Sequence, residues 1–328
     1  MNNLNTPAAP FGITPSTRLL GLLGYPVAHS LSPALHNACF QALGWNLRYL
    51  AFPVLPERLA QAVAGIRGLD LVGVNVTIPH KEAVLPFLTT IEPAAQKAGS
   101  VNTIKNDGGE LHGYNTDGPA FLALLREEAG LDPQQKRIVI LGTGGTARTV
   151  ATYLKQAGAG SLVIAGRNLE KAQHLAAATE AEAAVVLPKA KSQLEDGFSG
   201  LNPYAQSANR EDGTRRSTAG SSLSFQDFLA EAHLLVNCTS AGLYPQVDET
   251  PLDCLAPLPK TALVVDVIYN PRETRLMRLA KERGHQVVGG LGLLLRQASL
   301  AWEIWFGRPA PLEIMRQTAE GILSKNVE

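Results

Sequence analysis

The sequence predicts an α/β protein of two domains, and three observations lead to this prediction. Short apolar runs of strand length alternate with amphipathic stretches of helical length, which is typical of parallel sheets with crossover helices. The alternation forms two series, and a glycine-rich turn stands near the start of the second. At 328 residues the chain is long enough for two domains of ordinary size.

The first series predicts one α/β domain. Its expected strands are 18–24, 47–53, 70–76 and 100–105. Its expected helices are 33–43, 57–66 and 80–88, with a further helix at 118–129 that leads out of the domain. Ser32 is the expected N-cap of the first helix, because Pro33 suits a first helical turn. Residues 1–17 are polar and rich in Pro and Asn, and we expect a disordered tail there.

The second series predicts another parallel sheet with its helices. Its expected strands are 137–141, 161–165, 233–237 and 262–267. Its expected helices are 146–157, 169–178, 273–283, 291–306 and 311–323. Residues 188–224 interrupt the series with a polar, aperiodic stretch. A structureless loop of this length is uncommon inside a compact domain, so we expect a disordered surface insertion without a role in the site.

Composition excludes several classes of function. Lys plus Arg and Asp plus Glu number 29 each, which argues against nucleic acid or an anionic membrane as a partner bound through bulk charge. The three cysteines (Cys39, Cys238 and Cys254) lack C-x-x-C spacing, so neither a disulfide framework nor a metal site is predicted. No apolar run approaches the length of a membrane span. We therefore expect a cytoplasmic protein, either a monomer or a homodimer.

A lysine and an aspartate form the candidate catalytic pair. Lys81 ends the stretch Asn75-Val76-Thr77-Ile78-Pro79-His80-Lys81, and Asp117 lies downstream in Asn115-Thr116-Asp117-Gly118. If the two side chains meet in a cleft, they can move a proton at an alcohol or ketone carbon. Farther upstream, Ser30 and Ser32 place two hydroxyls where both could donate to one carboxylate near a helix N-terminus.

The glycine-rich turn predicts a Rossmann-type dinucleotide-binding domain. It follows the apolar strand 138–141 and opens a helix, which is the context that the dinucleotide fingerprint requires. Gly142 permits the tight turn, Gly144 allows the backbone to approach a pyrophosphate, and Ala147 takes the small position against the strand. The amides at the start of the helix then face the phosphates.

The end of the following strand selects the cofactor. An NAD enzyme usually places Asp or Glu there to bond the ribose hydroxyls, and this chain has Gly166-Arg167-Asn168 with Lys171 one turn later. Arg167 can stack on adenine and pair with a 2′-phosphate, and Lys171 can add charge. The sequence therefore predicts NADP.

Seven motifs in one order resemble the shikimate dehydrogenase family, over residues 18–323 apart from 188–224. They are His29-Ser30-Leu31-Ser32-Pro33, Asn75-Val76-Thr77-x-Pro79-x-Lys81, Val101-Asn102-Thr103, Asn115-Thr116-Asp117-Gly118, the turn at 142–146, Asn237-Cys238-Thr239-Ser240-x-Gly242, and Gly290-Leu291-Gly292 with Gln297. The resemblance implies a reversible, NADP-dependent reduction of 3-dehydroshikimate to shikimate in chorismate biosynthesis.

The resemblance also implies roles for individual residues. Lys81 matches the catalytic lysine and Asp117 its partner. The implied substrate contacts are Ser30, Ser32, Thr77, Lys81, Asn102, Asp117, Tyr269 and Gln297. The implied cofactor contacts are Gly142, Thr143, Gly144, Gly145, Thr146, Gly166, Arg167, Asn168, Lys171, Val267 and Gly290. Because Gln297 must reach the substrate, we expect 18–117 with 293–328 to form the substrate domain and 118–292 the NADP domain.

The chain departs from the family pattern at three of these positions. Gly166 stands where the family often has Asn, Lys171 replaces a frequent Arg, and Val267 replaces a common Met. The main alternative is a quinate/shikimate dehydrogenase that accepts NAD or NADP. A non-catalytic ligand sensor and a folate-cycle dehydrogenase are further alternatives. Retention of Lys81 with Asp117 argues against the sensor, and the pair of serines fits a small carboxylate better than a pterin.

Overall fold

The computed structural model describes residues 12–188 and 223–324, and they form two compact units. The first unit holds the described residues up to Glu127, together with Arg148–Tyr153 and those from Gly292 onward. The second unit holds Glu128–Ala147 and the described residues of Leu154–Leu291. The C-terminal helices thus belong to the first unit, which confirms the predicted fold class. Helix α5 (Asp117–Ala129) belongs to the first unit as far as Glu127, whereas the sequence places the start of the second domain at 118.

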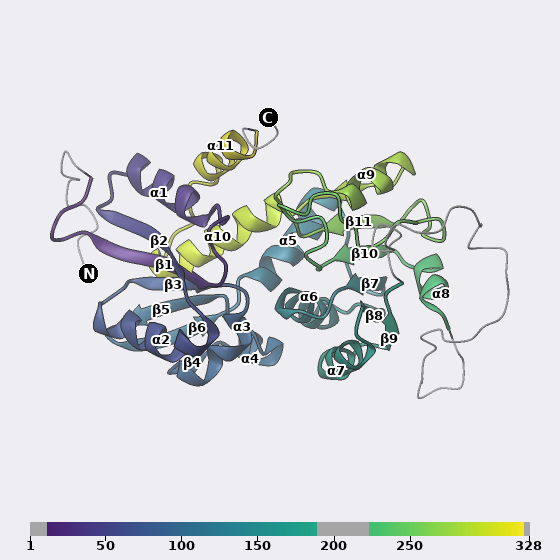
Figure 1. Ribbon diagram of the computed structural model, residues 1–328, viewed down its shortest axis with the longest axis horizontal. Coiled ribbons are helices and arrows are strands. Elements are labelled where there is room, and N and C mark those ends of the chain that lie inside the picture. Colours follow the sequence, from purple (N-terminus) through teal and green to yellow (C-terminus); the bar gives the residue numbers. More distant parts are fainter. Residues whose placement is uncertain (1–11, 189–222, 325–328) are drawn as a thin grey trace, which may run out of the picture. The chain divides into compact units, whose positions relative to one another are not determined.

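The first unit contains a six-stranded sheet in the order β2-β1-β3-β5-β6-β4. Its strands are β1 (Arg18–Gly24), β2 (Leu47–Pro53), β3 (Gly73–Val76), β4 (Thr90–Ile91), β5 (Thr103–Asp107) and β6 (Glu110–Tyr114). Its helices are α1 (Ser32–Ala42), η1 (Pro56–Arg58), α2 (Leu59–Gly68), α3 (His80–Ala83), η2 (Leu85–Phe87), α4 (Pro93–Ala98), α5 (Asp117–Ala129), α10 (Leu291–Phe306) and α11 (Leu312–Leu323). Helices α1 and α11 lie beside each other on one face of the sheet, and α2 packs on the other (Figure 1).

This first sheet is mixed, because a hairpin that the sequence analysis missed reverses the chain. Strand β5 is antiparallel to both β3 and β6. Asp107 pairs with Glu110 across a two-residue loop, and both loop residues, Gly108 and Gly109, have positive φ (61° and 97°). Positive φ at both positions is what a tight hairpin turn requires, and glycine supplies it without steric cost. The predicted strand 100–105 therefore begins three residues later and ends at the turn.

Three further local predictions for the first unit are wrong. Ser32 is not the N-cap of α1, because Leu31 already has helical φ and ψ (−78°, −15°) and makes no side-chain cap. The predicted helix 80–88 ends at Ala83, and Pro86 lies in the short turn η2, since proline has no N–H for a continuing helix. Of the predicted disordered tail, residues 12–17 are described: Thr17 donates to Asn46 (2.6 Å), and Asn46 donates to Thr14 (2.9 Å). Residues 1–11 lie outside the described part.

The second unit contains a six-stranded, wholly parallel sheet in the order β12-β11-β10-β7-β8-β9. Its strands are β7 (Arg137–Leu141), β8 (Ser161–Gly166), β9 (Ala183–Val186), β10 (Leu234–Asn237), β11 (Leu263–Asp266) and β12 (Val287–Val288). Its helices are α6 (Gly145–Gln156), whose middle part counts with the first unit, α7 (Leu169–Thr179), α8 (Phe225–Ala230) and α9 (Arg275–Glu282). The strand order reverses at β7, as in the doubly wound nucleotide-binding sheet.

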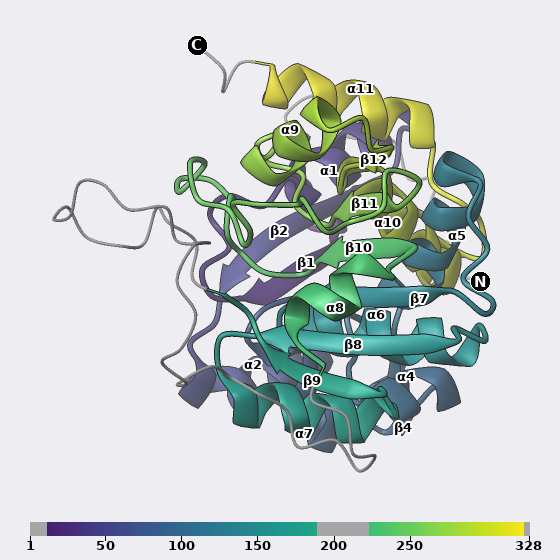
Figure 2. The same cartoon turned by 90° about the vertical axis from the view of Figure 1, so that its right-hand side faces the viewer.

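One hydrophobic core of the second unit covers one face of this sheet. Alternate residues of β7, β8, β10 and β11 pack with Phe225 and Leu229 of α8 and with Leu276 and Ala280 of α9. Figure 2 looks onto the face that α8 covers. Strands β9 and β12 were not predicted, because they have only four and two residues, too few for a recognisable alternation of apolar and polar positions. The predicted insertion 188–224 lies outside the described residues except at its two ends.

Candidate active site

Lys81 and Asp117 meet in the first unit as an ion pair. Lys81 Nζ lies 2.6 Å from Asp117 Oδ2, and each side chain is 13% exposed. Lys81 belongs to the short helix α3, and Asp117 is the first residue of α5. The pair is therefore sheltered from bulk water but not completely buried.

Sheet topology explains how residues 36 positions apart come together. The loops after β3 and after β6 lead to Lys81 and Asp117. Because β5 and β6 form the antiparallel hairpin next to β3, the end of β3, the start of β5 and the end of β6 share one edge of the sheet. Asn102 stands directly before β5 at this edge, where its N–H donates to Tyr114 O at 3.0 Å.

Asn102 holds the other oxygen of the Asp117 carboxylate. Its Nδ2 donates to Asp117 Oδ1 at 2.9 Å and to Thr116 Oγ1 at 2.9 Å, while its Oδ1 accepts from the Thr116 amide at 2.8 Å. Asp117 thus receives a donor on each oxygen, and the two hydrogen bonds fix the plane of the carboxylate. The geometry is suited to keeping an ammonium group in place beside a reacting carbon.

Within the described residues, no hydrogen bond joins the remaining predicted substrate residues of the first unit to Lys81, Asn102 or Asp117. Ser30 Oγ accepts from the Ser32 amide at 3.2 Å, so the two serines lie together before and at the start of α1. Thr77 follows β3, and a side chain at Gly24 would collide with its methyl group. Gln297 lies on α10, where its Nε2 donates to Leu294 O at 2.9 Å. Because β1 and β3 are parallel neighbours, the loops that follow them leave the same edge of the sheet.

The glycine turn of the second unit follows β7 at the strand-order reversal. Gly142 has φ +113°, a conformation that favours glycine, and an added Cβ would lie in tight contact with Cys238 O at 3.0 Å. Among the described residues, no atom beyond those adjoining Gly144 lies within 4 Å of a Cβ built on it. Open space over backbone amides at the start of α6 is what a bound pyrophosphate needs. Thr143, Gly145 and Thr146 complete the turn and the first residues of the helix.

The turn after β8 exposes two cations. Arg167 and Lys171 are exposed, and neither has an ion pair within the described residues. Asn168 is the N-cap of α7 and accepts from the Lys171 amide at 2.9 Å. At Gly166 an added Cβ would lie 2.6 Å from Thr143 Cγ2. Gly166 replaces the Asn that the family often has, and the Thr143 side chain fills the space that a side chain at 166 would need.

The loops after β10 and β11 are braced by a buried carboxylate. Asp266 accepts from Asn237 Nδ2 (3.1 Å), from Thr274 Oγ1 (2.7 Å) and from the Ile268 amide (3.1 Å). Burial raises the pKa of Asp266, and these hydrogen bonds oppose that shift. Val267 and Gly290 lie against each other, because a Cβ on Gly290 would overlap Val267 O. Tyr269, two residues after Val267, is half-buried.

Three residues that support the site were not assigned a role from the sequence. Asn75, Thr103 and Thr116 are all buried and hydrogen-bonded to Asn102. Each lies inside a motif that the sequence analysis had singled out. A buried polar residue beside a predicted site residue would have been the signal, but burial at these positions depends on the hairpin that was missed.

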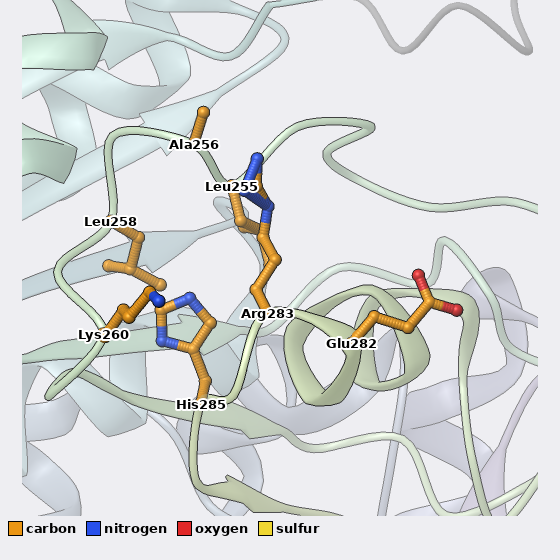
Figure 3. A pocket seen from close by; sticks show the side chains of 7 residues that line it. All are labelled: Leu255, Ala256, Leu258, Lys260, Glu282, Arg283 and His285. Atoms are coloured by element: carbon orange, nitrogen blue, oxygen red, sulfur yellow. The ribbon is translucent and has the colours of Figure 1, made fainter.

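A further cavity of about 280 Å³ lies in the second unit away from these residues (Figure 3). It is lined by Leu255, Ala256, Leu258, Lys260, Glu282, Arg283 and His285. Lys260 and His285 precede β11 and β12, so this cavity lies at the amino-terminal edge of the parallel sheet. The loops of the candidate site leave the opposite edge.

The described residues include no candidate membrane helix and no candidate metal cluster. No helix among them has the length and apolar character to cross a membrane. No group of three or more His, Cys, Asp or Glu side chains in residues 12–188 and 223–324 could hold a metal ion.

Comparison with family models matches three segments of the chain. Residues 22–104 match the shikimate dehydrogenase substrate-binding domain, 124–197 match shikimate/quinate 5-dehydrogenase, and 290–320 match the shikimate 5′-dehydrogenase C-terminal domain.

Curated relatives cover nearly the whole chain. A protein of Symbiobacterium thermophilum named shikimate dehydrogenase (NADP(+)) is 45% identical over 92% of this chain and 93% of its own. A protein of Methanopyrus kandleri with the same name is 42% identical over 92% of this chain and 94% of its own.

Solved structures agree with the sequence comparison. A shikimate dehydrogenase in complex with NADP+ superposes with a TM-score of 0.78 at 34% identity, covering 95% of this chain and 97% of that one. The enzyme of Thermus thermophilus in complex with shikimate gives 0.73 at 32% identity, covering 94% and 99%. The fold and the site define a two-domain α/β protein with a Rossmann-type unit. The chain belongs to the shikimate dehydrogenase family, which confirms the resemblance read from its motifs.

Proposed function

We propose that this protein catalyses the reversible, NADP-dependent reduction of 3-dehydroshikimate to shikimate. The observation that carries the proposal is the sheltered pair of Lys81 and Asp117, 2.6 Å apart, at an edge of the first sheet. Family membership supports the reaction, because relatives at 45% and 42% identity are named shikimate dehydrogenase (NADP(+)).

Lys81 would handle the proton of the reaction. During reduction its ammonium group donates a proton to the carbonyl oxygen of the substrate, and during oxidation the neutral amine takes the hydroxyl proton back. Asp117 orients the amine through Oδ2, and Asn102 fixes the carboxylate through Oδ1. An ammonium group beside the carbonyl also stabilises negative charge that develops on the oxygen.

The other predicted substrate residues would fix the orientation of the ring. Ser30 and Ser32, adjacent at the start of α1, supply hydroxyl donors for the substrate carboxylate. Thr77, Asn102, Tyr269 and Gln297 are proposed to bind the ring hydroxyls. The first unit would then bind most of the substrate and the second unit the cofactor.

The residues of the second unit fit NADP. The open space over Gly144 and the amides at the start of α6 suit a pyrophosphate. Arg167 and Lys171 are exposed cations on the turn after β8, where they would form ion pairs with a 2′-phosphate. When bound, the nicotinamide supplies the hydride to the substrate carbon, or accepts it in the reverse direction. Val267 and Gly290 would form the wall beside the nicotinamide ring.

A spectrophotometric assay tests the proposal. The purified protein is given shikimate with NADP, shikimate with NAD, quinate with NADP and quinate with NAD, and formation of the reduced nicotinamide is followed. We expect the largest kcat/KM for shikimate with NADP. A larger value for quinate with NAD would favour the broader quinate/shikimate dehydrogenase, and no turnover in any arm would refute a dehydrogenase of either kind. The cytoplasmic location and the choice between monomer and homodimer stay predictions.

A further inference from the structure

We propose that Tyr49 and Thr103 are positioning residues that act on the proposed catalytic pair through a one-way chain of hydrogen bonds. The chain runs Tyr49 to Asn75 to Thr103 to Asn102 to Asp117, and at each step the donor lies on the Tyr49 side. The three new members of the chain, Tyr49, Asn75 and Thr103, have no role in the predicted site. The chain of hydrogen bonds is a feature of the first unit. Only its expected effect on kcat rests on the proposed function.

A backbone group fixes the orientation of the Asn102 amide. The Thr116 N–H can only donate, and it lies 2.8 Å from the Asn102 side-chain oxygen. Asn102 Oδ1 is therefore the acceptor end of the side chain, and Nδ2 must face Asp117, to which it donates at 2.9 Å. The last link of the chain thus has only one possible direction.

A second backbone group fixes Asn75 in the same way. The Asn102 carbonyl oxygen can only accept, and it lies 3.1 Å from Asn75 Nδ2. Asn75 Oδ1 is therefore turned toward Tyr49, whose hydroxyl must donate to it across 2.7 Å. Burial raises the pKa of Tyr49 well above its usual value, so this hydroxyl keeps its proton.

Thr103 joins the two amides. Its hydroxyl accepts from Asn75 Nδ2 at 3.0 Å and donates to Asn102 Oδ1 at 3.2 Å. A hydroxyl has one proton, so accepting from Asn75 leaves that proton free for Asn102. Asn75, Asn102, Thr103 and Tyr49 are all buried, at 6%, 3%, 0% and 0% exposure.

The shared direction has a physical consequence. Each donor in a chain of hydrogen bonds polarises the next, and the effect is stronger in a buried, low-dielectric environment. The chain ends on the carboxylate oxygen that does not contact Lys81, so it strengthens the anchor that fixes the Asp117 plane. Loss of an upstream donor should let the carboxylate, and with it the Lys81 amine, leave its working position.

Crossed variants at Thr103 separate this role from simple packing. Thr103→Val keeps the volume of the side chain and removes the hydroxyl, whereas Thr103→Ser keeps the hydroxyl and removes a buried methyl group. We expect Thr103→Val to lower kcat about 3- to 10-fold, the effect of one buried hydrogen bond, with KM for shikimate changed less than twofold. Thr103→Ser should stay near the wild-type kcat. Equal kcat for Val and wild type, or a Ser variant as slow as the Val variant, would overturn the proposal.

Tyr49→Phe tests the first donor and keeps the ring that stacks on His36 at 4.3 Å. We expect a similar 3- to 10-fold loss of kcat. Thr179→Val is the control: this buried hydroxyl of the second unit donates to Leu175 O at 2.8 Å within α7 and has no part in the chain. Its kcat should equal that of the wild type. Full activity of Tyr49→Phe would remove Tyr49 from the chain and contradict the proposal.

A spectroscopic measurement keeps the inference separate from the proposed activity. The side-chain amide signal of Asn102 is assigned by its absence in Asn102→Asp and is followed by ¹H–¹⁵N NMR. Tyr49→Phe should shift this signal although Asn75 and Thr103 lie between the two side chains, and Thr179→Val should leave it in place. Wild-type protein that is inactive but shows this pattern would refute the proposed function and keep the chain. Active protein without the Tyr49-dependent shift would refute the chain of hydrogen bonds and keep the proposed function.

Discussion

The indole Nε1 of Trp302 donates a hydrogen bond of 2.7 Å to Nδ1 of His36, joining α10 to α1 inside the first unit. Both side chains are completely buried, and the two rings are nearly parallel, at 10°. Because Nδ1 accepts, the imidazole must be neutral, with its proton on Nε2. This bond is one of the interactions that hold the C-terminal helices on the first sheet.

The stability of the protein should fall in mild acid because of this histidine. Burial lowers the pKa of His36 from 6.5 to about 3. The unfolded chain binds a proton near pH 6.5, whereas the folded protein does not. This histidine therefore leaves the free energy of unfolding unchanged above pH 6.5 and lowers it as pH falls toward 3. The full loss of free energy of unfolding from this group is about 5 kcal/mol. Urea denaturation between pH 7.5 and pH 5 should show part of this loss.

His36→Gln is the variant that checks this assignment. Glutamine can still accept from Trp302 but does not titrate, so the variant should be less stable at neutral pH and less sensitive to acid. His174→Gln, at an exposed histidine on α7, is the control and should keep the wild-type pH dependence. An unchanged slope in His36→Gln would show that other groups cause the acid sensitivity.

Replacing the proposed proton donor should affect turnover far more than binding. Lys81→Ala is expected to lower kcat by at least about 10²-fold, the lower range for loss of a general acid or base. Shikimate affinity, measured by calorimetry, should change less. Lys97→Ala, an exposed lysine on α4, serves as the control. Near-normal kcat in Lys81→Ala would exclude Lys81 as the proton-transfer group.

The sequence predicted the elements with strong periodicity and missed those formed by few residues. Strand β1 and helices α5, α7, α10 and α11 begin and end within one residue of prediction. The hairpin after Asp107 was missed although Gly108-Gly109 is a hairpin signal, because the polar strand β5 shows little alternation.

The candidate site was predictable in its motifs but not in its connections. Lys81, Asn102 and Asp117 come from three separate motifs, and only the antiparallel hairpin brings Asn102 and Asp117 to one edge. The hydrogen bonds from Tyr49 and Thr103 depend on tertiary packing that no local pattern encodes. The match between Gly166 and Thr143 likewise links two loops whose contact is set by the pairing of β7 with β8.

Arg167 should decide between the two nicotinamide cofactors. Only NADP has the 2′-phosphate that a guanidinium would bind, so Arg167→Ala should raise the Kd for NADP much more than the Kd for NAD. Fluorescence titration with each cofactor measures both. Arg283→Ala, at the cavity on the opposite edge of the sheet (Figure 3), makes the same change in charge and should alter neither Kd. Equal losses for NADP and NAD would indicate stacking on adenine or a folding role.

The space between Gly166 and Thr143 should determine how well the phosphate turn binds its cofactor. In Gly166→Ala the new Cβ would lie 2.6 Å from Thr143 Cγ2, so the loop must shift at a cost of about 1–3 kcal/mol. We expect KM for NADP to rise by about tenfold, which corresponds to about 1.4 kcal/mol. Thr143→Ala removes the colliding methyl group, so the double variant should recover most of the wild-type KM.

Gly144→Ala provides the contrast, because a Cβ there meets no protein atom within 4 Å. The folded protein should tolerate it, and the new methyl group should weaken NADP by occupying space that the pyrophosphate needs. Adding Thr143→Ala should not restore this loss, since no contact between the two side chains causes it. Recovery in the Gly166 pair without recovery in the Gly144 pair would support the steric account. Failure of Thr143→Ala to rescue Gly166→Ala would mean that Gly166 is required for another reason, such as direct contact with the cofactor.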